Sequence, residues 1–189
     1  MLIDILKEHD VKTTFFVVGS WVDKYPESVK ALSDAGHEIM NHSDSHPHMT
    51  QISEETMKKE VDLCDAKIKA ITGKEPYLFR PPYGDYNESV ISTLADCGHY
   101  TVQWSVDSLD WKDLSAQEIY ARVTGNIHPG AIVLFHNAAK NTPEALPLIL
   151  KNLKESGYKI VPVSELIHKD NYMIDHTGKQ IIKSQSQEG

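Results

Sequence analysis

The sequence predicts a single α/β domain in which short parallel strands form a barrel-like sheet covered by helices. Apolar strand-like runs alternate with helical patterns along most of the 189 residues, and this alternation is typical of parallel strands joined by right-handed crossovers. The six strand-like runs are short and apolar on both faces, which favours a barrel over an open sheet. No glycine-rich phosphate loop follows any of them, so a nucleotide-binding sheet is not indicated.

The chain begins with a helix and a buried strand. Leu2, Ile5 and Leu6 form an apolar helix face, and residues 13–18 are a β-branched and aromatic run that ends at Gly19. A unit of helix, capping glycine and short strand then repeats. Helices are predicted at residues 28–35, 53–72, 87–97, 116–127 and 143–156, with strands after them at 37–40, 77–79, 100–106, 131–135 and 158–163.

Composition places limits on partners and on domain organisation. The length fits one domain, at residues 1–168, followed by a polar tail at 169–189 that we expect to be partly disordered. A net charge of -8 argues against a nucleic acid or an anionic membrane as partner, and no apolar run is long enough for a transmembrane segment. Cys64 and Cys97 lie in helical apolar patterns, which indicates buried free thiols more than a disulfide.

Two histidines follow the strand predicted at residues 37–40. His42 and His46 stand among Asn, Ser, Asp and Pro residues, which are turn formers and therefore place the pair on a loop. Imidazoles held at the end of a rigid strand suit a borderline-soft divalent metal. A histidine-rich surface loop without a metal is the alternative interpretation.

Polar residues also occupy the ends of three later strands, where a parallel barrel gathers its chemistry. Arg80 closes an apolar strand before Pro81 and Pro82, and this stiff turn leaves the N–H groups of Tyr83 and Gly84 available to an oxyanion. A rigid turn with no further role is the alternative.

The last two strand ends carry Asp107 to Trp111 and Leu134 to His136. Beside a carboxylate such as Asp107, the imidazolium form of His136 is favoured and could act as a general acid. Alternatively, Asp107 and Asp110 only cap the next segment, Trp111 belongs to the core, and His136 is a satisfied core histidine.

Together these motifs resemble those of the polysaccharide deacetylases of the NodB-homology type, carbohydrate esterase family 4. The resemblance extends from residue 1 to about residue 168 and implies a distorted (β/α) barrel. It also implies an enzyme that removes N- or O-acetyl groups from chitin-like, peptidoglycan or xylan chains with a divalent metal. The matching segments are His42 to His46 (His-[Ser/Thr]-x-x-His), Arg80 to Tyr83 (Arg-x-Pro-Tyr), Asp107 to Trp111 (Asp-x-x-Asp-Trp) and Leu134 to His136 (Leu-x-His).

The resemblance implies a role for each residue. His42 and His46 would bind the metal, commonly zinc, with cobalt or nickel as alternatives. Arg80 would orient the catalytic base, and the turn of Pro82 and Tyr83 would line the groove, with the Tyr83 N–H holding the oxyanion. His136 would protonate the leaving amine with Asp107 as its partner, while Trp111 and Leu134 would form the wall of the acetyl pocket.

One family motif has no counterpart. The Thr-Phe-Asp-Asp-Gly segment of the family's first strand supplies the base and the third metal ligand, and no Asp-Asp pair occurs in this sequence. We therefore expect a barrel that lacks its first strand, an N-terminal truncation and an unpaired edge that favours dimerisation. Asp44 and His48 are the substitutes considered for the third ligand. Loss of the base would lower activity by about 10²–10⁴-fold.

The sequence thus predicts a metal-dependent hydrolase that removes acetyl groups, N-acetyl first, from cell-wall polysaccharide, with impaired activity in this chain. A non-catalytic glycan-binding or structural barrel is the alternative, and a metal-binding protein without a carbohydrate partner is a weaker third. The resemblance implies an extracytoplasmic or cell-wall location, although the N-terminal residues read as an amphipathic helix and not as a signal peptide.

Overall fold

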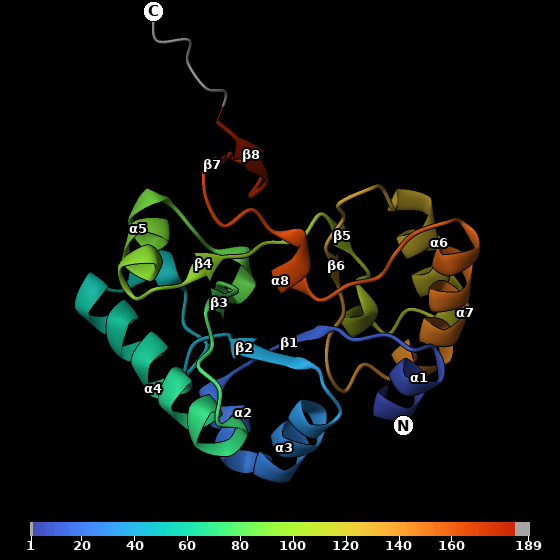
Figure 1. Ribbon diagram of the computed structural model, residues 1–189, viewed down its shortest axis with the longest axis horizontal. Helices are drawn as coiled ribbons and strands as arrows, with labels where there is room; N and C mark the ends of the chain where they lie inside the picture. Colours follow the sequence, from blue (N-terminus) through green and yellow to red (C-terminus); the bar gives the residue numbers. More distant parts are fainter. Residues whose placement is uncertain (1, 184–189) are drawn as a thin grey trace, which may run out of the picture.

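The computed structural model describes residues 2–183 and has an α/β fold (Figure 1). The strands are β1 (Thr14–Val17), β2 (Glu38–Asn41), β3 (Leu78–Phe79), β4 (Tyr100–Thr101), β5 (Val106–Asp107), β6 (Val133–Leu134), β7 (Tyr172–Ile174) and β8 (Gln180–Ile182). The α-helices are α1 (Leu2–Glu8), α2 (Gly19–Lys24), α3 (Pro26–Asp34), α4 (Glu54–Thr72), α5 (Glu88–Asp96), α6 (Ala116–Asn126), α7 (Thr142–Glu155) and α8 (Val163–Leu166). Three short 3₁₀ helices are η1 (Met49–Gln51), η2 (Pro82–Gly84) and η3 (Asp110–Lys112).

The strands that carry the site are parallel, as predicted. Strands β1, β2, β3 and β4 form one sheet in that order, and β5 pairs with β6 in a second sheet. The strand predicted at residues 100–106 is divided between the two sheets. The N–H of Val102 still bonds to Phe79 of β3, whereas the N–H of Ser105 bonds to Ile132 beside β6. The chain therefore crosses from one sheet to the other within this segment.

The two parallel sheets do not close on each other through the part of the chain that the structure describes. β1 and β4 are the edges of the larger sheet, and β6 pairs only with β5. The strand predicted at residues 158–163 is not formed, and α8 begins at Val163. An extended segment needs backbone hydrogen bonds to a neighbouring strand to become a strand itself. In the described part of the chain, the N–H of Val163 donates to the side-chain hydroxyl of Thr14 at 2.9 Å and not to a strand backbone. The figure shows this segment passing between the two sheets (Figure 1).

The C-terminal segment is more ordered than the sequence suggested. Residues 172–182 form the antiparallel hairpin β7–β8, in which Met173 faces Ile181. The hydroxyl of Tyr86 donates to the carbonyl oxygen of His176 at 3.2 Å, so the hairpin contacts the loop after β3. Expected disorder at residues 184–189 lies outside the described residues.

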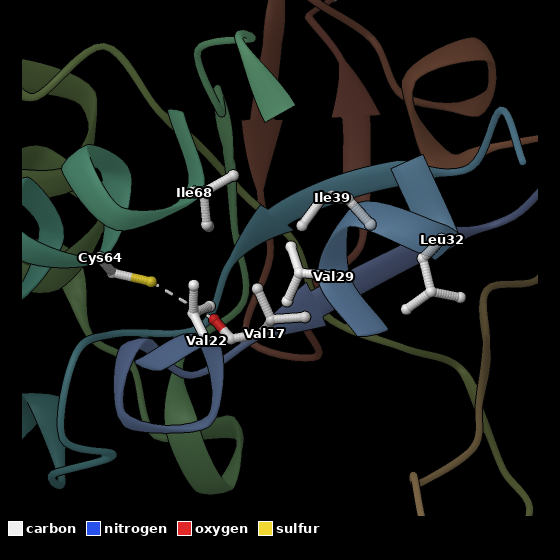
Figure 2. Packing of buried hydrophobic residues seen from close by; sticks show 7 residues of the cluster. All are labelled: Val17, Val22, Val29, Leu32, Ile39, Cys64 and Ile68. Carbon is white, nitrogen blue, oxygen red and sulfur yellow. Dashed lines mark hydrogen bonds between the residues drawn. The ribbon is translucent and has the colours of Figure 1, made fainter. Parts of the chain in front are cut away.

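The core consists of several apolar clusters between the sheets and their helices. The cluster beneath β1 and β2 joins α2, α3 and α4, and Figure 2 shows its members: Val17, Val22, Val29, Leu32, Ile39, Cys64 and Ile68. Cys64 is buried, and its Sγ lies 3.4 Å from the carbonyl oxygen of Val17. Cys97 is also a free thiol but only half-buried. Among residues 2–183, no helix is long and apolar enough to cross a membrane.

Candidate active site

The two histidines of the loop after β2 face each other. Their ring centroids lie 4.9 Å apart with an interplanar angle of 75°. The Nδ1 atom of His42 lies 2.5 Å from the carbonyl oxygen of Arg80, which can only accept a hydrogen bond. Nδ1 therefore carries the proton and Nε2 keeps its lone pair, which is the arrangement found in metal-binding histidines.

The surroundings keep this pair neutral. Burial lowers the pKa of His42 to about 4 against the opposing effect of the bond to Arg80, and the nearby charges of His46, Arg80 and His136 lower it further. Burial also lowers the pKa of His46. Both imidazoles are thus unprotonated at neutral pH, which is the form that binds a metal.

The described residues offer two metal ligands and not three. Within residues 2–183, no group of three or more His, Cys, Asp or Glu side chains is placed to hold an ion. Asp44 is bound by Lys67 at 2.6 Å, and the ring of His48 stacks on that of Tyr83 with centroids 4.1 Å apart. Asp44 and His48, the two residues suggested from the sequence as a third ligand, therefore do not join His42 and His46. A catalytic zinc normally has three protein ligands. The two imidazoles therefore supply two of the three ligands that such a site needs.

Arg80 is buried without a carboxylate partner in the described part of the chain. Its guanidinium carbon lies 4.2 Å from the centroid of the Phe16 ring, and its Nε has no hydrogen-bond partner among residues 2–183. Burial lowers the pKa of Arg80 to about 10. A buried cation normally has a counter-charge, so the base that Arg80 was predicted to orient has no counterpart among these residues.

The turn at residues 81–84 leaves one N–H group free and uses the other. Tyr83 has φ 61°, a conformation that costs energy for a residue other than glycine. Its N–H finds no acceptor within residues 2–183, whereas the N–H of Gly84 donates to Pro81 at 3.1 Å. The prediction that Gly84 is available to an oxyanion is therefore wrong. The ring of Tyr83 covers His46 with centroids 4.6 Å apart, and Pro82 is buried beneath it.

His136 pairs with Asp110, so the predicted pairing with Asp107 is wrong. The Nδ1 atom of His136 lies 2.8 Å from Oδ1 of Asp110, and the backbone N–H of His136 donates to Oδ2 at 3.0 Å. Asp107 instead accepts from the N–H of Leu109 at 2.9 Å. Leu109 has φ 52°, and this tight turn moves Asp107 away and brings Asp110 inward. From the sequence alone, the role suggested for Asp110 was that of a cap.

Asp110 is a fully buried carboxylate that its neighbours keep ionised. Burial opposes its ionisation, but hydrogen bonds from His136 and Thr142 outweigh burial and hold the pKa of Asp110 below its usual value. The Thr142 hydroxyl donates to Oδ2 at 2.7 Å. Thr142, at the start of α7, was not identified from the sequence, because no motif connects it to Asp110, which lies 32 positions earlier. The His136 side chain is left 38% exposed, and its Nε2 has no hydrogen-bond partner in the described part of the chain.

The two residues predicted to form the wall of the acetyl pocket differ in their exposure to solvent. Leu134 is buried on β6, whereas the indole of Trp111 is 56% exposed and has Lys112 over its ring. Trp104 was not predicted, yet its ring lies 5.8 Å from the guanidinium of Arg80. It also contacts Gly84, where an added Cβ would lie 2.9 Å from the indole.

Comparison with known proteins identifies the family. The family model of polysaccharide deacetylases matches residues 1–102. The chain belongs to the polysaccharide deacetylase family. The chain is 36% identical over 170 residues to the peptidoglycan-N-acetylmuramic acid deacetylase PdaA of Bacillus subtilis, with coverage of 88% of this chain and 65% of the relative. It is 34% identical over 169 residues to a peptidoglycan-N-acetylglucosamine deacetylase of Bacillus cereus, with coverage of 87% and 62%.

Solved structures of this family confirm the fold. A CE4 family pseudoenzyme from Bacillus anthracis is 38% identical with a TM-score of 0.86, over 89% of this chain and 59% of that one. A family 4 carbohydrate esterase from Streptomyces lividans has 32% identity and a TM-score of 0.80, over 96% and 89% of the two chains. The chain spans 52% to 65% of the length of the first curated relatives it matches.

Proposed function

We propose that this chain is the barrel of a peptidoglycan deacetylase that hydrolyses the N-acetyl group of an amino sugar. The observation that carries the proposal is the His136–Asp110 pair, which lies beside the two facing imidazoles of His42 and His46. The relatives are peptidoglycan deacetylases by name, which favours N-acetylglucosamine or N-acetylmuramic acid residues as substrate and the cell wall as the place of action.

Each described group has a chemical task in this proposal. The free N–H of Tyr83 donates to the oxyanion that forms on the acetyl carbon. His136 holds a proton at Nε2 and transfers it to the departing amine, while Asp110 fixes the ring through Nδ1 and stabilises its charged form. His42 and His46 would hold a divalent metal, zinc first and cobalt or nickel next, and such a metal would supply polarisation of the acetyl carbonyl and acidification of water.

The described residues do not supply a catalytic base for this reaction. No carboxylate of residues 2–183 reaches Arg80, and only two metal ligands meet. We therefore infer activity lower than that of a complete site by about 10²–10⁴-fold. The same observation favours the second candidate, a barrel that binds glycan without cleaving it, and one of the similar solved structures is that of a pseudoenzyme. Dimerisation through the free edge of β1 stays a prediction.

The test measures acetate release from N-acetylglucosamine oligomers and purified peptidoglycan, with zinc or cobalt added. We expect slow release that His136→Ala abolishes and that the control His128→Ala, at an exposed histidine after α6, leaves unchanged. Calorimetry with zinc is run in parallel on His42→Ala. Glycan retention without acetate release would refute the deacetylase and support the binding module. Release that survives His136→Ala would refute the assignment of the proton donor.

A further inference from the structure

The loop that carries the two histidines contains backbone conformations that are unfavourable by themselves. Ser43 and His46 both have left-handed φ angles, 66° and 63°. Such angles are uncommon for residues other than glycine and persist only when the surroundings impose them. The facing arrangement of His42 and His46 therefore depends on whatever holds Ser43 and His46 in place.

One set of restraints comes from inside, through Asn41 at the end of β2. Asn41 is fully buried, and its Nδ2 donates to Oδ1 of Asp65 on α4 at 2.7 Å. Its Oδ1 accepts from the N–H of Ser43 at 2.7 Å. The Ser43 hydroxyl in turn accepts from the N–H of His46 at 2.9 Å. These hydrogen bonds form a continuous path from the Asp65 carboxylate to the backbone of the second histidine.

Asp65 is itself held in position. Its Oδ1 lies 3.3 Å from Nε2 of the buried His99, and Nδ1 of His99 lies 3.1 Å from the carbonyl oxygen of Cys97. The Nδ2 of Asn41 also reaches the Val61 carbonyl on α4 at 3.0 Å. The Asn41 amide therefore has one orientation in which every polar atom is satisfied, so its Oδ1 must point towards Ser43.

A second set of restraints comes from the outer side of the loop. Oε2 of Glu60 on α4 accepts from the N–H of Asp44 at 2.9 Å and from that of Ser45 at 2.7 Å. Oε1 of the same carboxylate accepts from the Ser45 hydroxyl at 2.7 Å. Bonds from N–H groups to an ionised carboxylate are stronger than neutral ones. Glu60 thus fixes the middle of the loop, between the two histidines.

We propose that Glu60 and Asp65 of α4 are positioning residues of the candidate site, which hold the loop in the conformation that turns His42 and His46 towards each other. They act on the two histidines through the loop backbone and Asn41. Only the importance of this geometry for metal binding rests on the proposed function. Asp62 lies on the same helix, is exposed and has no hydrogen bond or ion pair to the loop among the described residues, so Asp62→Ala is a matched control.

The first arm of the test needs no metal. In nitrogen-15-labelled protein, we expect Glu60→Ala to speed hydrogen exchange at the amides of Asp44 and Ser45 at least tenfold. Asp65→Ala should do the same at Ser43. Both variants should shift the imidazole signals of His42 and His46, and Asp62→Ala should change none of these. Exchange rates and imidazole signals identical to those of the parent protein in both variants would overturn the proposal.

The second arm titrates cobalt and follows its visible absorption. Residues that support metal ligands typically change metal affinity by about 10–100-fold, so we expect Glu60→Ala to weaken cobalt binding at least tenfold at an unchanged melting temperature. Glu60→Gln keeps one acceptor oxygen and should recover part of the loss, and it also serves if Glu60→Ala folds poorly. If the parent protein binds no cobalt, the metal-dependent function fails, while the exchange arm still decides the positioning role.

Discussion

Replacing Gly19 by alanine should displace the histidine loop from α2. Gly19 is the first residue of α2, and its N–H donates to the Ser43 carbonyl at 2.9 Å. An added Cβ would lie 2.0 Å from Oδ1 of Asp44 and 3.1 Å from its Cα. Ordinary contact begins near 3.4 Å, so the carboxylate would have to move by more than an ångström. Lys67 holds it at 2.6 Å, which makes that movement costly.

The expected cost is that of overpacking a tight contact, about 1–3 kcal/mol in the free energy of unfolding. Urea denaturation, monitored by circular dichroism, measures this change in the free energy of unfolding. The control is Gly125→Ala in α6, where an added Cβ meets nothing within 4 Å. That change should be neutral or stabilising by up to about 1 kcal/mol, because alanine favours a helix over glycine.

A double variant separates the steric cause from a change in helix propensity. Asp44→Ala removes the carboxylate that the new methyl group would meet, so Gly19→Ala should cost less in that background by about 1 kcal/mol. The remaining cost comes from the backbone of residue 44. Equal stability of Gly19→Ala and the parent protein, or the same cost in both backgrounds, would refute the close approach of α2 to the loop.

Two further predictions concern the buried charges of the site. Asp110→Asn should lower the free energy of unfolding by about 1–3 kcal/mol at pH 7, because the buried acceptor of His136 and Thr142 loses its charge. Since the pKa of Asp110 is held below 3.8 in the folded state, its stabilisation is complete above that pH and disappears as pH falls through the folded value. Urea titrations from pH 7 to pH 3 should therefore show the two proteins converging, and a constant difference would contradict this account. Arg80→Met should be neutral or stabilising by about 1 kcal/mol, because it removes a buried cation that has ring contacts but no carboxylate partner within residues 2–183; a loss above about 2 kcal/mol in thermal unfolding would contradict this account.

Local patterns in the sequence determined the longer helices and the parallel strands that formed, whereas the short helices α2 and α8 were not predicted. The capping residues and glycine stops of α4 and α5 act within one turn of the chain, so their bounds can be read from the residues themselves. The two-histidine loop, the proline turn and His136 were also identified correctly as ends of strands, since parallel strands carry polar residues at one edge.

Tertiary structure decided which of these groups meet. Asp107 and Asp110 are equivalent by composition, and only the left-handed turn at Leu109 brings Asp110 to His136. Residues 158–163 have the composition of a strand, but a strand requires a neighbour that the pattern does not supply. Similarly, the sequence shows Glu60 and Asp65 only as charged residues of a helix. Their hydrogen bonds to the histidine loop and to Asn41 become visible only in the folded structure. Pairing between residues distant in sequence depends on how the chain is packed, and a single sequence does not contain that information locally.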